Sequence, residues 1–76
     1  MTKTIYIYDC IKNKSLFALT YDHKGTNLPL DSCQGKWHYL KTIYISENDH
    51  ILIVGLLPKD IIEKLEQNGY MIHSLK

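Results

Sequence analysis

The sequence predicts an α+β fold, in which a four- to five-stranded, mostly antiparallel sheet carries one helix packed on one face. Residues 3–21 and 37–46 alternate isoleucine, tyrosine and other strand-forming side chains at period two, as strands do. Residues 58–69 carry clear start and stop signals for a helix. The chain has 76 residues, of which 45% are hydrophobic, so we expect one small domain over residues 1–76.

The first half of the chain predicts a β-hairpin followed by a long loop. "TIYIYDCI" alternates, "KNK" interrupts the pattern and "SLFALTY" resumes it, so the hairpin is expected from about residue 3 to residue 21. Residues 22–38 contain two glycines, a proline and several small polar residues, which indicates an irregular loop. Loops of this length in small domains are commonly functional or mobile.

The second half predicts a strand, a turn, a second strand, a helix and a last strand. The apolar run Ile51–Leu57 is typical of a central strand buried on both faces, with Gly55 marking a bulge or a close backbone contact. Pro58 suits the first helical position, and Asn68-Gly69 supplies a left-handed C-cap. The predicted order is ββ–loop–ββ–α–β, and a crossover through the helix would place the last strand parallel to a neighbour.

The pentapeptide KTIYI occurs twice, at residues 3–7 and 41–45. The identity does not extend further, so we interpret the two copies as similar strands rather than as a repeat. Each copy has an isoleucine face and a tyrosine face, because side chains alternate along a strand. The apolar stripe of the helix would cover the isoleucines. The opposite face would then carry three tyrosines: Tyr6, Tyr8 and Tyr44.

Two interpretations of this tyrosine face remain open. Exposed aromatic side chains on a sheet are typical of a binding surface, and Trp37 and His38 would lie at its margin. Alternatively, Leu28, Leu30 and Trp37 of the long loop fold back over the tyrosines as a lid.

We therefore predict a small, non-enzymatic, intracellular protein-binding module of the regulator or inhibitor type, whose partner is another protein or a second copy of the chain. No cofactor and no catalytic set is predicted. The formal net charge is +1, and all nine basic side chains are lysine, so nucleic acid is the less favoured partner. In that alternative, single-stranded nucleic acid would stack on the same face while Lys3 and Lys41 contact phosphates.

The cysteines and histidines leave one further alternative, a zinc-ordered small domain. Cys10, His23, Cys33 and His38 are suitable ligand types, but their spacing lacks a paired knuckle, so no metal site is predicted. "MTKTIYIYDC" does not resemble an export signal, and the longest apolar run has seven residues. We expect a cytoplasmic chain that does not span a membrane, with both thiols reduced. A composition rich in A/T-encoded residues suggests a bacterial or phage source.

Overall fold

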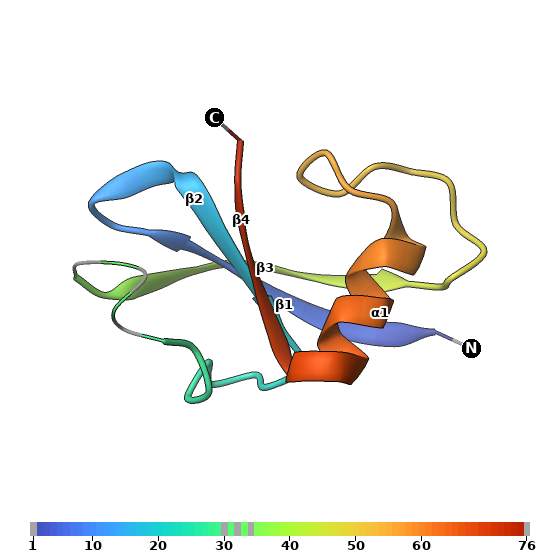
Figure 1. The fold of residues 1–76 in the computed structure, drawn as a ribbon, viewed down its shortest axis with the longest axis horizontal. Coiled ribbons are helices and arrows are strands. Elements are labelled where there is room, and N and C mark those ends of the chain that lie inside the picture. Colours follow the sequence, from blue (N-terminus) through green and yellow to red (C-terminus); the bar gives the residue numbers. More distant parts are fainter. Residues whose placement is uncertain (1, 30, 32, 34, 76) are drawn as a thin grey trace.

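The computed structural model describes residues 2–29, 31, 33 and 35–75. In this part of the chain, every strand pairs antiparallel with its neighbour, and the order across the sheet is β3-β1-β2-β4 (Figure 1). The predicted α+β class with a helix on the sheet is confirmed. The elements are β1 (Lys3–Cys10), β2 (Asn13–Thr20), β3 (Trp37–Ile45), α1 (Pro58–Asn68) and β4 (Tyr70–Ser74).

Apolar side chains form a layer on each face of the sheet. On one face, the buried side of α1 packs against isoleucines and a leucine of the strands: Ile5, Ile7, Leu19 and Ile45. On the other face, Tyr8 and Ala18 pack against Leu28 from the long loop. The alternation of isoleucine and tyrosine in β1 therefore separates two small cores, as period two requires.

The helix begins and ends where its sequence signals indicate. Pro58 occupies the start of α1, and Gly69 follows its end with a φ of +84°. The Gly69 N–H donates to the carbonyl oxygen of Leu65 at 2.7 Å, which satisfies one of the last helical carbonyls. Within the described residues, no helix is long and apolar enough to cross a membrane.

Residues 51–57 form a turn, so the predicted central strand was wrong. Ile53, Val54 and Leu56 are half-buried against the helix-side core, and the other four residues of the turn are exposed. Ile53 and Leu56 exchange two backbone hydrogen bonds of 2.8 Å. Between them, Val54 and Gly55 have φ values of +46° and +82°, the signature of a type I′ hairpin turn. The chain reverses inside the apolar run, and Ile51 is 75% exposed. Apolar composition indicated burial, but the glycine marks a reversal of the chain.

The last strand is antiparallel to its neighbour, which corrects the expected parallel pairing. β4 pairs with β2 from Leu16↔Ser74 to Thr20↔Tyr70. The expectation treated residues 51–57 as a strand leading directly into the helix. Because that segment is a turn, the helix does not complete a simple strand–helix–strand crossover, and parallel pairing is not imposed.

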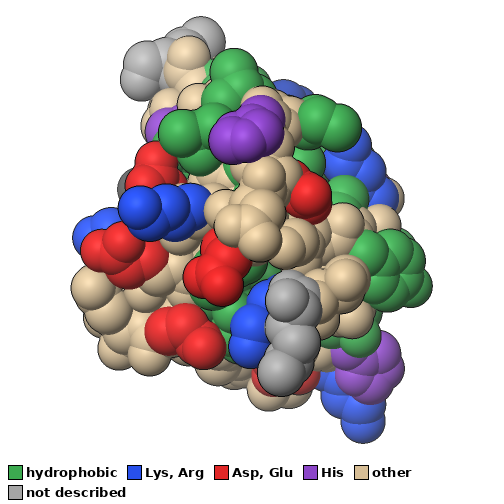
Figure 2. Space-filling model, turned by 90° about the vertical axis from the view of Figure 1, so that its right-hand side faces the viewer, with side chains coloured by type: hydrophobic (Ala, Val, Ile, Leu, Met, Phe, Trp, Pro, Cys, Tyr) green, Lys and Arg blue, Asp and Glu red, His purple; other side chains and the backbone are tan. Residues whose placement is uncertain are grey.

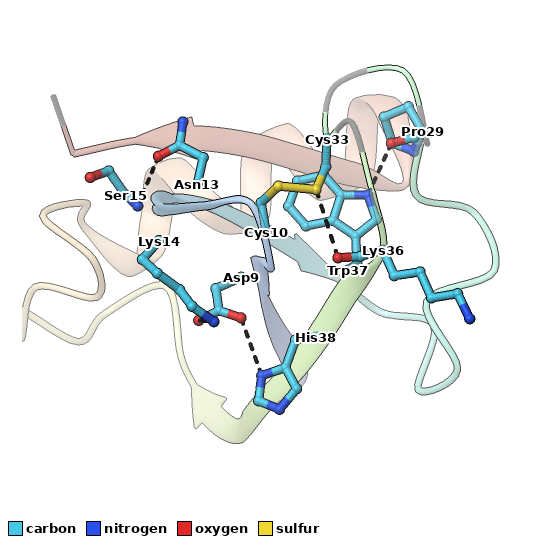
Figure 3. The surroundings of a disulfide bond; sticks show 10 residues. All are labelled: Asp9, Cys10, Asn13, Lys14, Ser15, Pro29, Cys33, Lys36, Trp37 and His38. Atoms are coloured by element: carbon cyan, nitrogen blue, oxygen red, sulfur yellow. Dashed lines mark hydrogen bonds and ion pairs between the residues drawn. A yellow bond between two sulfur atoms is a disulfide. The ribbon is translucent and has the colours of Figure 1, made fainter.

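Cys10 and Cys33 are joined in a disulfide with their Cα atoms 5.7 Å apart (Figure 3). The expectation of two reduced thiols was therefore wrong. Cys10 pairs with Trp37 across β1 and β3, and the Ile11 N–H donates to the carbonyl of Lys36 at 3.2 Å. This pairing brings the loop before β3 to the end of β1. The spacing of the two cysteines in the sequence did not indicate that these two segments are adjacent.

Candidate binding surface

The loop before β3 covers the central part of the tyrosine face. Tyr8 is 7% exposed, and its hydroxyl donates to the carbonyl of His23 at 2.9 Å. Leu28 is buried against the Tyr8 side of the sheet. The indole N–H of Trp37 donates to the carbonyl of Pro29 at 2.9 Å. The lid interpretation therefore applies at Tyr8; the predicted lid residue Leu30 lies outside the described residues.

A polar cluster of a buried threonine and an exposed asparagine attaches this loop to the end of the helix. Thr20 is fully buried, and its hydroxyl donates to the side-chain oxygen of Asn27 at 2.8 Å. The Asn27 amide nitrogen donates in turn to the carbonyl of Gly69 at 3.0 Å. Because Asn27 contacts both the sheet and the helix cap, it fixes the loop relative to both elements.

A carboxylate organises the first turn of the loop. Asp22 accepts hydrogen bonds from the backbone N–H groups of Lys24 and Thr26, each at 3.0 Å, and from the Thr26 hydroxyl. The Thr26 hydroxyl, and then the Lys24 N–H, hold the pKa of Asp22 below its usual value, because they stabilise the charged form. The loop is thus held by its own polar groups as well as by the disulfide.

The structure separates the residues that we predicted to bind a partner. Tyr8 is buried, and Tyr6 and Trp37 are half-buried beside the loop. His38 is exposed, and Tyr44 is 69% exposed. A continuous tyrosine face is therefore not exposed, and the exposed part of the predicted set lies on β3.

The candidate zinc ligands are also separated. The sulfur atoms of Cys10 and Cys33 are bonded to each other, which leaves neither thiolate for a metal. The His23 ring packs edge-on against Tyr6 with centroids 5.8 Å apart. Among the described residues, no group of three or more histidine, cysteine, aspartate or glutamate side chains is arranged to hold a metal ion.

A group of ionisable side chains, Asp9, Lys14 and His38, lies beside the disulfide at the N-terminal end of β3 (Figure 3). Asp9 is 8% exposed and contacts the Nδ1 atom of His38 at 3.2 Å and the Nζ atom of Lys14 at 3.8 Å. The carboxylate can orient the imidazole, as in catalytic pairs. In the described part of the chain, no serine, threonine or cysteine side chain is hydrogen-bonded to His38. Asp9 thus forms an ion pair with Lys14 and a hydrogen bond with His38 at the edge of the sheet.

The outer edge of β3 exposes a row of large side chains. Tyr39, Leu40 and Tyr44 are 48%, 42% and 69% exposed. β3 is an outermost strand, and the described residues make no backbone hydrogen bond to it other than those from β1. An unpaired edge of this kind presents N–H and C=O groups that another strand can bind. Sequence analysis missed Tyr39 and Leu40, because composition does not tell an edge strand from an inner one.

A β-bulge divides this edge into two parts. On β1, Ile7 pairs with Lys41 and the next residue, Tyr8, pairs with Tyr39, so Leu40 is left without a partner. The Tyr39 ring packs edge-on against Tyr8 with centroids 5.8 Å apart, which holds the bulge in place. The regular part of the edge runs from residue 41 to residue 45.

Lys3, one of the two lysines of the nucleic-acid alternative, lies beside carboxylates. Lys3 contacts Glu66 at 3.8 Å and lines an open groove of about 560 Å³ beside α1. This groove also contains Glu47 and Glu63, so carboxylates outnumber lysines there. Figure 2 shows acidic and basic side chains mixed over this end of the molecule. Such a surface does not favour phosphate groups.

A second apolar surface surrounds the turn at residues 51–57. A Cβ atom on Gly55 would lie 3.8 Å from the side chain of Leu75, so the turn and the C-terminal segment are neighbours. Figure 2 shows hydrophobic side chains gathered beside a histidine at the upper end of this face. The turn and the C-terminal segment carry four exposed large apolar side chains: Ile51, Leu52, Leu57 and Leu75.

Comparison of the chain with protein families, with curated proteins and with solved structures found no match. The surfaces described above therefore carry the functional argument by themselves.

Proposed function

We propose that this protein is a small, non-enzymatic protein-binding module that receives an extended polypeptide segment along the free edge of β3. In this proposal, backbone groups of β3 pair with the incoming segment, and Tyr39, Leu40 and Tyr44 contact its side chains. The observation that carries the proposal is the unpaired, nine-residue edge strand with three exposed large side chains. Strand addition is a recurring mode of peptide recognition.

The composition of β3 supports this use of the edge. Its sequence, WHYLKTIYI, contains a single lysine and no acidic residue. Soluble proteins commonly protect long edge strands with several charges, with proline or with a covering segment. In β3, the bulge at Leu40 and the charge of Lys41 provide the protection, and apart from His38 and Thr42 the remaining side chains are apolar or aromatic. Tyrosine anchors bury large areas at low entropic cost.

A regulator or inhibitor role is consistent with this binding mode, and bacterial or phage origin stays a prediction from composition. Cytoplasmic location also stays a prediction. The disulfide between Cys10 and Cys33 argues against it, because disulfides are typical of oxidising compartments.

The proposal is tested by affinity capture from the host lysate, with nuclease and without, using matched edge variants. Leu40→Lys places a second charge on the edge, and Tyr44→Ala removes the most exposed anchor. Leu52→Lys is the matched control, because Leu52 is 61% exposed and lies in the 51–57 turn. We expect a nuclease-resistant partner that both edge variants lose and the control retains.

Three results would contradict the proposal. Loss of the partner with Leu52→Lys but not with Leu40→Lys would move the binding surface to the 51–57 turn. Recovery only before nuclease treatment would favour nucleic acid. Equal recovery with all variants would show that the edge is not used. Thermal unfolding of each variant shows whether a loss of binding reflects a loss of fold.

A further inference from the structure

We propose that the segment bound by the β3 edge belongs to a second copy of this chain, paired antiparallel about a two-fold axis at Ile43. This inference rests on the proposed function, because it names the partner of the same edge. It joins two four-stranded sheets into one continuous sheet through β3 of each copy.

Ile43 is the central residue of the regular part of the edge. Because the bulge interrupts β3 at Leu40, five residues from Lys41 to Ile45 remain for uninterrupted pairing. A two-fold axis perpendicular to the sheet places the helix-side faces of the two copies next to each other. Residues directly opposite each other must then belong to the same face. Because side chains alternate between faces, the axis must fall at a residue position and not midway between two neighbouring residues. Among the axes through this segment, the one at Ile43 pairs all five residues. It places Lys41 opposite Ile45, Thr42 opposite Tyr44, and Ile43 opposite its own copy.

The side chains on each face match in this register. On the loop side, each Tyr44 lies beside the partner's Thr42 and diagonal to the partner's Tyr44, within reach of an aromatic ring. The most exposed aromatic side chain of β3 is thereby covered. On the helix side, the half-buried Ile43 of each copy meets the other, and this contact extends the helix-side core across the axis.

The charges near the edge are also complementary. Within the described residues, neither Lys41 nor Glu47 forms an ion pair in its own chain. Lys41 faces Ile45 of the partner, and Glu47 lies in the turn that begins just after that residue, so the partner's Glu47 comes within reach of the long Lys41 side chain. The symmetry makes two such pairs. An axis at Thr42 would instead place Lys41 opposite Ile43 and diagonal to the partner's Lys41 and Ile45, which brings two like charges together.

Charge reversal combined with sedimentation analysis tests this register. We expect the natural chain to dimerise with rising concentration. Lys41→Glu and Glu47→Lys should each weaken the dimer about 10-fold, because each converts two attractions into two repulsions. The double variant should return the dissociation constant to within about 3-fold of the natural value. Lys64→Glu on the exposed side of α1 is the matched control, and it should leave the dimer unchanged.

The outcomes separate this inference from the proposed function. A chain that stays monomeric at all concentrations overturns the second copy as partner, whereas a lysate protein still lost with Leu40→Lys leaves the edge-binding function standing. A dimer that neither reversal weakens, or that the double variant fails to restore, overturns the Ile43 register. A dimer that Leu40→Lys and Tyr44→Ala both leave intact overturns the use of the edge as well.

Discussion

Tyr8 packs directly against the backbone of Gly25: a Cβ atom at this glycine would lie 2.8 Å from the Cζ atom of the tyrosine ring. Gly25 also has a φ of +64°, in the left-handed region that other residues adopt at a cost. The loop thus lies close over the sheet because one of its residues has no side chain at the point of contact. The closure of the tyrosine face depends on this relationship.

Gly25→Ala is therefore expected to destabilise the protein by about 1–3 kcal/mol, since it adds a steric clash to a strained backbone. Urea unfolding measures the loss, and hydrogen exchange of the loop amides shows whether the lid loosens. Gly35→Ala is the matched control, because its Cβ would meet the flexible side chain of Lys12 at 3.4 Å. Equal destabilisation by the two substitutions would contradict the proposed packing of the loop on Tyr8.

Reduction of the disulfide is expected to weaken the same lid. Cys10 and Cys33 are 23 positions apart, and a cross-link closing a loop of that length stabilises a protein by about 3 kcal/mol. We expect the double variant Cys10→Ser/Cys33→Ser to lose a similar amount of stability and to unfold at lower urea concentration. Unfolding of the natural chain with and without a thiol reductant provides the comparison. Two superimposable curves would contradict the expected stabilisation by the disulfide.

The sequence predicted most of the elements but not which segments of the chain become neighbours in the fold. The isoleucine–tyrosine alternation in β1 and the caps of α1 are local signals, and both were confirmed. The disulfide and the cover over Tyr8 depend on which strands become neighbours, and this information is not local. The 51–57 run was misassigned because its six apolar residues outweighed its one glycine. Val54 adopts a φ of +46° there, which a β-branched residue rarely does.

For the candidate site, prediction identified Tyr44 and His38 as exposed side chains near a binding surface, but it placed them on a face instead of an edge. An edge position follows from strand order, and the order β3-β1-β2-β4 has no simple signature in the chain. Prediction missed Leu40 for the same reason, because its position in a bulge is defined only by the pairing of β3 with β1.

The loop should also respond to acid through Asp22. Hydrogen bonds from Thr26 and Lys24 lower the pKa of Asp22, so its stabilising effect is complete above the unfolded-chain pKa of about 3.9. The effect is lost as pH falls through the lower pKa of the folded state. We expect Asp22→Asn to flatten the acid limb of the curve of stability against pH. Urea unfolding between about pH 2 and pH 6 measures it.

Thr26→Val separates this effect from a general change of charge. It removes the hydroxyl that contributes most to the lowered pKa and keeps the carboxylate. The acid limb should then lie between those of the natural chain and Asp22→Asn. An unchanged limb in both variants would mean that Asp22 does not contribute to the pH dependence.

The hydroxyl of Thr20 is expected to contribute more to the stability of the protein than its methyl group does. Thr20 is fully buried, and its hydroxyl donates to Asn27 and accepts the backbone N–H of Asp22 at 3.0 Å. Thr20→Val preserves the shape but leaves both partners unsatisfied, which costs about 1–3 kcal/mol. Thr20→Ser retains the hydroxyl and loses one methyl group, worth about 1 kcal/mol. Urea unfolding should therefore rank the valine variant below the serine variant, with faster hydrogen exchange at the Asp22 amide. The reverse order would show that packing, and not this hydrogen-bond cluster, attaches the loop to the sheet.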